Sequence, residues 1–180
     1  GYGADGAGST VYTLAAKTGV TGLTDTASGE AVVLSVNAGV VEGKTANGAL
    51  VFTVSVDASG TVTLDQKRAV VHANVTNPDD AISLSSADLI SLTATVTDRD
   101  GDSKAATVDL GKAISFKDDG PSITAGTATA GALTVDETTL GTNAVVNMSG
   151  LFSGVGYGAD GAGSTVYTLA AKTGVTGLTD

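Results

Sequence analysis

Several residue types that commonly stabilise or functionalise a domain are scarce in this chain of 180 residues. Cysteine and tryptophan are absent, and there are only 4 Tyr, 3 Phe and 2 Pro. Disulfides are therefore excluded, and so is a cysteine-based zinc site. No apolar run approaches the roughly 18 residues of a membrane-spanning helix, so we expect no membrane insertion.

Basic residues are also few, which limits the possible partners. The chain has 9 Lys and Arg against 19 Asp and Glu, a formal net charge of −10. Nucleic acid is an unexpected partner because phosphate contacts need Lys and Arg. The chain has a single histidine, His72, between Val71 and Ala73, and no G-x-S-x-G motif. We therefore expect a half-exposed or hydrogen-bonded strand histidine and no enzyme, since a lone histidine supplies no catalytic triad.

The residues that are abundant indicate an all-β protein. Thr, Val, Ser and Gly dominate, and apolar residues recur at every second position in many short stretches. Turn sequences such as DASG, NPDD and DRDGD separate these stretches. Alternating stretches that are separated by Gly- and Asp-rich turns about 8–12 residues apart predict an antiparallel β-sandwich. The expected strands are 10–16, 31–36, 49–57, 61–66, 69–73, 89–98, 105–111 and 113–119, with one helical turn near 85–90.

The first 25 residues return unchanged at the end of the chain. Residues 1–25 and residues 156–180 both read GYGADGAGSTVYTLAAKTGVTGLTD, so the offset is 155. This period exceeds the 20–50 residues of solenoid repeats and has the size of a domain. The sequence therefore predicts a tandem array of near-identical domains, whose neighbouring repeats are one another's partners.

Pro121 suggests where one repeat ends and the next begins. It follows an acidic turn, KDDG, after a predicted strand. We expect 1–120 to be the larger, C-terminal part of one repeat and 121–180 the N-terminal part of the next. The incomplete first repeat would then be completed by the second folding back, as in a circular permutant, or by strand exchange between copies of this fragment.

Alternating aspartates around a glycine give the strongest chemical signal. Asp98, Asp100 and Asp102 fall within DRDGDS, and three such carboxylates can converge on a hard cation such as Ca²⁺. The loop differs from an EF-hand because its glycine is fourth rather than sixth. The alternative is an ordinary hairpin turn in which Asp side chains cap the backbone.

A second group of acids surrounds the predicted boundary. Asp118 and Asp119 precede Pro121, and Asp136 and Glu137 follow it. One interpretation is that Ca²⁺ ions bridge consecutive domains here, with the DRDGDS turn at the same end of the sandwich. The other is a solvated turn and strand edge.

A glycine motif in the repeated segment carries less weight. GYGADG matches G-x-G-x-x-G at Gly1, Gly3 and Gly6, and again at Gly156, Gly158 and Gly161. A dinucleotide site requires a helix after the motif, whereas STVYTLA is a strand pattern. We interpret the motif as a glycine-rich loop.

Long stretches of the sequence resemble a known family. They resemble the tandem extender repeats of giant RTX adhesins, which Gram-negative bacteria export by type I secretion. The stretches are LTVDETTL, YGADGAGSTVYTL, VFTVSVDASGTVTLDQKRAVVH, LISLTATVTDRDGDS and ISFKDDGP. The resemblance implies an Ig-like β-sandwich in a long array at the cell surface, although a period of 155 exceeds an Ig domain of about 100 residues.

The resemblance also implies a function and a ligand set. Such repeats are calcium-stiffened spacers that hold a ligand-binding region away from the cell for biofilm attachment. Asp98, Asp100, Asp102, Asp118 and Asp119 are the implied calcium ligands, with Asp136 and Glu137 as further candidates. The alternative function is a calcium-dependent sugar-binding adhesin module, against which the small number of aromatic residues counts.

Overall fold

The computed structural model describes residues 6, 8–74 and 76–178, and these residues form an all-β protein. Its hydrogen-bonded strand pairs are all antiparallel, in one five-stranded, one three-stranded and two two-stranded sheets. The all-β, antiparallel sandwich that the alternating pattern predicts is therefore confirmed. Gly1 and Gly3 of the glycine motif lie outside the described residues.

The five-stranded sheet has the order β2-β3-β4-β5-β6. Successive strands are joined by short turns, as expected of an antiparallel meander. Side chains alternate between its two faces: Val32 and Leu34 are buried, whereas Val33 is 40% exposed. The strands are β2 (Val20–Thr24), β3 (Ala31–Asn37), β4 (Val40–Lys44), β5 (Leu50–Val56) and β6 (Val62–Gln66).

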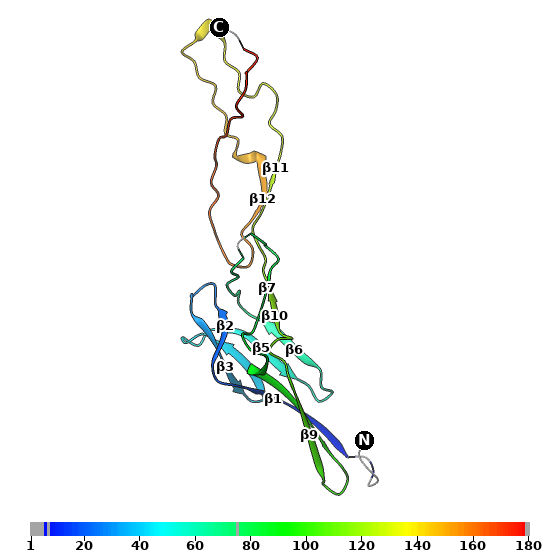
Figure 1. Cartoon of the computed structure of the whole chain (residues 1–180). Coiled ribbons are helices and arrows are strands. Elements are labelled where there is room, and N and C mark those ends of the chain that lie inside the picture. The colour runs from blue at the N-terminus through cyan, green and yellow to red at the C-terminus, as the bar shows by residue number, and fades with distance from the viewer. Residues whose placement is uncertain (1–5, 7, 75, 179–180) are drawn as a thin grey trace.

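The second layer contains a three-stranded sheet in the order β1-β8-β9. Its strands are β1 (Ser9–Ala16), β8 (Ile90–Thr97) and β9 (Ser103–Asp109), and the 3₁₀ turn η1 (Ala87–Leu89) leads into β8. A small sheet of β7 (Ala81–Ser83) and β10 (Ser115–Lys117) lies at the end of the body that faces away from the β8–β9 turn (Figure 1). Only one end of the β1-β8-β9 sheet covers the core, because Leu14 and Ile90 are buried whereas every residue of β9 is exposed.

Aliphatic side chains and two phenylalanines fill the space between the layers. The rings of Phe52 and Phe116 lie with centroids 5.1 Å apart, and both are fully buried. Gly43 faces Phe52 from the adjacent strand, where an added Cβ would lie 2.3 Å from a ring carbon. A glycine is therefore required at this position, since packing of this density leaves no space for a side chain.

One carboxylate is buried at the edge of this core. Asp25 follows β2, is completely inaccessible to solvent, and accepts two hydrogen bonds from the Arg68 guanidinium at 2.8 and 2.9 Å. The backbone N–H and hydroxyl of Ser28 also donate to it. The Arg68 hydrogen bonds are the main reason that the pKa of Asp25 lies well below its ordinary value, although burial acts against them. This ion pair connects the end of β2 to the segment that follows β6.

After β10 the chain leaves the body, the sandwich of residues 8–118, and forms an extended arm, residues 121–178 (Figure 1). In the arm β11 (Ser122–Ala125) pairs with β12 (Phe152–Gly156), and two 3₁₀ turns occur, η2 (Glu137–Thr139) and η3 (Ser149–Leu151). No described residue of the arm is buried. Among the described residues there is also no helix with the length and apolar character needed to cross a membrane.

The strand predictions differ from the structure mainly where strands are short. The predicted strand 69–73 is reduced to a single bridge between Val70 and Asp25. Strands β2, β4, β7, β11 and β12 were not predicted, because glycine or few apolar residues weaken their alternation. The helical turn near 85–90 is confirmed as η1. Strands were also expected in LTVDETTL and AVVNMSGLF. These segments contain 3₁₀ turns instead, and only Phe152, the last residue of the second segment, belongs to a strand, β12.

We expect Phe52→Ala to lower the free energy of unfolding by about 3–5 kcal/mol, because it removes a fully buried ring and leaves a cavity. Chemical denaturation followed by circular dichroism would measure this. Phe152→Ala in the arm is the matched control, since Phe152 is 39% exposed, and it should leave the transition of the body unchanged.

We expect Asp25→Asn to destabilise the body by about 3 kcal/mol, the lower end for breaking a buried pair, because Arg68 keeps some contact with water. The folded pKa of Asp25 is depressed, so its stabilisation is present above about pH 4 and is lost as the pH falls further. Thermal unfolding at several pH values would detect a larger loss of stability in the parent than in the variant. Asp65→Asn, at an exposed pair with Lys67, should have little effect.

Candidate metal centre

The hairpin between β8 and β9 places three aspartates in one turn. The two strands pair up to Thr97 and Ser103, and residues 98–102, here called the Asp turn, connect them. The Asp98 N–H donates to the Asp102 carbonyl at 2.9 Å and closes the turn. Gly101 adopts a φ of +104°, which favours glycine at this position. The strand alternation and the glycine together fix where the aspartates lie.

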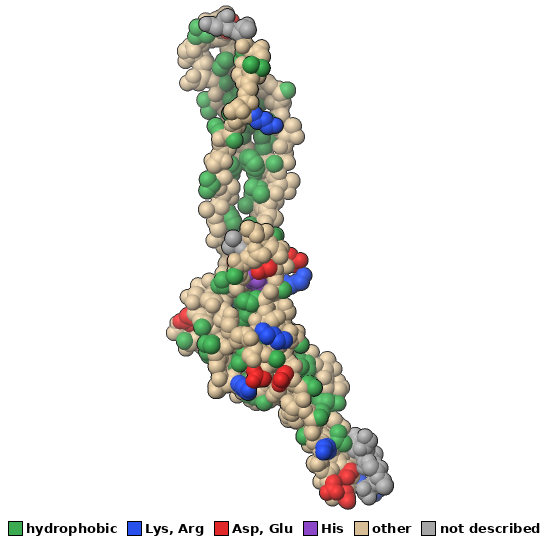
Figure 2. Space-filling model, in the orientation of Figure 1, with side chains coloured by type: hydrophobic (Ala, Val, Ile, Leu, Met, Phe, Trp, Pro, Cys, Tyr) green, Lys and Arg blue, Asp and Glu red, His purple; other side chains and the backbone are tan. Residues whose placement is uncertain are grey.

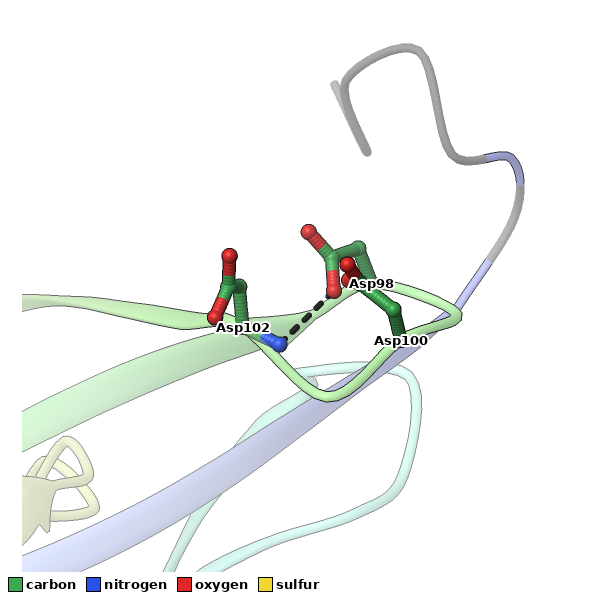
Figure 3. Close-up of side chains that lie close together, drawn as sticks. All are labelled: Asp98, Asp100 and Asp102. Atoms are coloured by element: carbon green, nitrogen blue, oxygen red, sulfur yellow. Dashed lines mark hydrogen bonds between the residues drawn. The ribbon is translucent and has the colours of Figure 1, made fainter.

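Within the turn, Asp98 has a structural role. Its Oδ1 accepts hydrogen bonds from the backbone N–H groups of Gly101 at 3.1 Å and Asp102 at 2.8 Å. Figure 3 shows the bond from Asp102. The pKa of Asp98 lies below its ordinary value, first because the Asp100 carboxyl, when it carries a proton, can donate it to Asp98 and then because backbone N–H groups donate to it. Desolvation acts in the opposite direction. Asp98 is therefore held as a carboxylate by the turn itself.

The geometry of the Asp turn fits a hard divalent cation. One carboxylate oxygen from each of Asp98, Asp100 and Asp102 lies within 4.8 Å of the others, and Asp98 is partly buried while the other two are exposed. Ca²⁺ takes about six to eight oxygen ligands, so these carboxylates would supply part of the shell and water or carbonyl groups the rest. The turn could hold such an ion, although exposed acidic turns also occur without one.

Asp118 and Asp119 lie in a different chemical setting, at the junction of the body and the arm. The Asp118 N–H donates to the Asp80 carbonyl at 2.9 Å, and the Asp119 N–H donates to Asp118 Oδ1. They line an open cavity of about 480 Å³ that basic residues also line. Its charged and ionisable lining is Lys67, Arg68, His72, Lys117, Asp118, Asp119 and Asp160. Positive charge thus already lies beside these carboxylates.

Asp136 and Glu137 are far along the arm and do not join another acid cluster. Asp136 caps η2 by accepting from the backbone N–H of Thr138 at 2.8 Å and from its hydroxyl at 2.7 Å. These hydrogen bonds lower the pKa of Asp136. Of the seven predicted ligands, the described residues bring only those of the Asp turn together as a possible metal site.

The Asp turn and the junction lie at opposite ends of the body (Figures 1 and 2). The interpretation that placed them at the same end is therefore wrong. The reason is the length of the β8–β9 hairpin, which extends beyond the core and carries its turn away from β10. A single calcium cluster formed by both acidic groups of one chain is excluded by this separation.

A buried histidine–aspartate contact at the junction was missed by the sequence analysis. His72 Nδ1 and Asp80 Oδ1 lie 3.0 Å apart, and the His72 side chain is only 5% exposed. The two atoms do not meet hydrogen-bond geometry, so the contact is an ion pair when the imidazole is protonated. His72 lies outside the strands, contrary to the prediction. No local signal links residues 72 and 80, because the loop between them determines their approach.

The fold and the Asp turn define an antiparallel all-β domain with one candidate cation site among its described residues. The sequence matches the family described as Domain of unknown function (DUF5801) over residues 1–111 and 132–180. The chain belongs to this family. No match was found among curated proteins or among solved structures.

The different roles within the Asp turn lead to a prediction for metal-free protein. Asp98→Ala should lower the melting temperature in EDTA, because it removes the acceptor for two backbone N–H groups. Asp100→Ala should leave it unchanged or raise it, because it relieves repulsion between neighbouring carboxylates. Differential scanning calorimetry would measure both. A larger loss in Asp100→Ala than in Asp98→Ala would contradict these roles.

Proposed function

We propose that this protein is a spacer domain of a long extracellular chain, in which repeats hold a ligand-binding region away from the cell. The observation that carries the proposal is the identical segment at an offset of 155 residues. The first copy of this segment supplies a strand to each of the two larger sheets of the body, which supports a repeating unit that contains a whole sandwich. A function that depends on length explains such repetition, since a copied domain adds length without new chemistry.

The shape of the chain supports the same function. The body and its β8–β9 hairpin continue into the arm as one elongated molecule (Figure 2). The N-terminal and C-terminal regions lie near opposite ends (Figure 1). Domains joined in this way add their lengths rather than packing into a compact cluster. Resemblance to the extender repeats of RTX adhesins supports a location at the surface of a Gram-negative bacterium and export by type I secretion.

Calcium is the proposed stiffening ligand, and the Asp turn is its site. Each period of 155 residues has 17 Asp and Glu against 8 Lys and Arg, a net charge of −9, so neighbouring domains would repel and bound cations would reduce that repulsion. At the Asp turn, Ca²⁺ would hold the three carboxylates together and oppose fraying of the exposed hairpin tip. Asp118 and Asp119 remain candidates for a second ion at the junction.

We expect calcium to raise the melting temperature and EDTA to lower it. The ion binds the folded turn, so stability rises with the logarithm of free calcium above Kd, by about 2.7 kcal/mol at 100 times Kd. Extracellular modules bind in the range of about 10⁻⁴–10⁻³ M. Magnesium should substitute poorly, because it requires a tighter octahedral shell. Identical melting curves in EDTA and in millimolar calcium would refute the calcium proposal.

Paired variants locate the ion. Asp100→Ala with Asp102→Ala should abolish most of the calcium-induced shift in melting temperature. Asp118→Ala with Asp119→Ala removes the same charge at the junction and should preserve that shift. The junction variant should instead shorten the mean length of tandem repeats in calcium, as measured by small-angle X-ray scattering. An unchanged calcium shift in the Asp100/Asp102 variant would exclude the Asp turn as the site.

A further inference from the structure

The second copy of the glycine motif lies at the end of the arm that faces the body (Figure 1). Residues 156–163 are here called the glycine loop, and the same letters stand at residues 1–8. Strand β12 ends at Gly156, which pairs with Ser122 beside the junction. The glycine loop therefore begins where the arm meets the body.

Two residues of the glycine loop contact the junction. The hydroxyl of Thr26, the residue after the buried Asp25, donates to Asp160 Oδ1 at 3.1 Å. Gly158 has a φ of +71°, and an added Cβ there would lie 1.7 Å from the Asp119 carbonyl oxygen. A side chain at position 158 is therefore excluded by the φ angle and by the close approach of the two backbones.

The surface that receives the glycine loop is itself attached to the body. The Asp118 N–H donates to the Asp80 carbonyl at 2.9 Å, and the Gly120 N–H donates to the Pro78 carbonyl at 3.2 Å. An added Cβ at Gly120 would lie 2.1 Å from the Pro78 Cβ. The chain that leaves β10 thus stays against the body up to Gly120, so the glycine loop contacts a part of the body rather than a free connection.

The first copy shows where the other end of the same letters lies. Gly8, which corresponds to Gly163, packs against the Asp turn, where an added Cβ would lie 1.8 Å from the Thr97 carbonyl oxygen and 2.7 Å from the Asp98 Cα. Strand β1 begins at the next residue, Ser9, opposite Thr97. The last residue of these eight letters therefore contacts the Asp turn of the body that follows it.

The one glycine of the motif that is described in both copies has the same conformation in each. Gly6 has a φ of +97° and Gly161, its counterpart, a φ of +102°. At both positions an added Cβ would have no heavy atom within 4 Å. This agreement supports a common shape for the loop, so that contacts seen in one copy can be combined with those seen in the other.

We propose that the glycine loop docks each repeat on the body of the preceding repeat and brings the Asp turn of the later repeat beside Asp118 and Asp119 of the earlier one. Position 158 lies at the junction and position 163 corresponds to the contact with the Asp turn. The steps between them span at most about 18 Å. This inference rests on the tandem array of the proposed function and assigns the contact between its members.

The same distance argument explains why one body alone does not show this proximity. Strand β8 (Ile90–Thr97) leads from the core to the Asp turn and is by itself about 27 Å long at 3.4 Å per residue. The Asp turn and Asp118 therefore lie at opposite ends of one body, but on the two sides of one junction in an array. Each body then follows the preceding one head to tail.

A chain of two periods, residues 1–155 followed by residues 1–180, tests this placement. The chain has no cysteine, so Lys67→Cys in the earlier repeat and Arg99→Cys in the later one supply a single pair of spin-label sites. Lys67 lines the junction cavity, and Arg99 belongs to the Asp turn. The matched control carries the same two substitutions within one repeat. We expect double electron–electron resonance to give a shorter distance across the junction than within one body.

An equal or longer distance across the junction overturns the proposal, even where small-angle X-ray scattering shows the elongated chain that a spacer requires. A compact two-period chain in the scattering experiment would instead refute the spacer function. The two failures are therefore distinguishable.

Two glycine variants test the docking contact in the chain of 180 residues, in EDTA. Gly158→Ala and Gly161→Ala both place alanine at a positive φ, but only the alanine at 158 meets backbone atoms. Spin labels at Ser35→Cys in the body and Ser153→Cys in the arm, both exposed, report the distance between them. We expect Gly158→Ala to broaden the distance distribution at least twofold and Gly161→Ala to leave it close to the parental one.

The melting transition of the body should be parental in both variants, because neither glycine belongs to the core. A parental distance distribution in Gly158→Ala, or equal broadening in the two variants, overturns the docking contact.

Discussion

The body depends on backbone pairing along its two sheet edges, where residues 9–24 add β1 to one sheet and β2 to the other. These strands bring Leu14 and Leu23 into the core and end at Asp25, whose ion pair with Arg68 fixes the exit of β2. A sandwich without disulfides, tryptophan or a large aromatic core has few other means of stabilisation. Its integrity therefore depends on the segment that the sequence repeats.

The acidic clusters of the body lie at its two ends rather than at one site. The Asp turn lies at the tip of the β8–β9 hairpin, whereas the junction carries both acids and bases around His72. This separation fits the proposed spacer, because each end of the body would meet a different neighbour in an array. A cation at the exposed tip and ion pairs at the junction would reduce repulsion at the two ends independently.

Much of the body could be predicted from alternation alone. The two-residue period is visible in β1, β3, β5, β6, β8 and β9. Asp98, Asp100 and Asp102 are close in sequence, so a turn is enough to bring their carboxylates together. Contacts between distant residues were not predictable. The Asp25–Arg68 pair and the His72–Asp80 contact depend on how loops cross between the sheets. The direction of the β8–β9 hairpin, and hence its distance from Asp118, depends on packing as well.

The sequence by itself determined the β class, the acidic character, the turn of three aspartates and the recurrence of a 25-residue segment at an offset of 155. It could not determine which structure the repeated segment takes, because the same letters are edge strands at residues 9–24 and exposed chain at 164–178. Alternating residues favour a strand only when a neighbouring strand satisfies their N–H and C=O groups and a second layer covers their apolar side chains. The tertiary structure provides β8, β3 and the core to the first copy, and these neighbours make its residues strands.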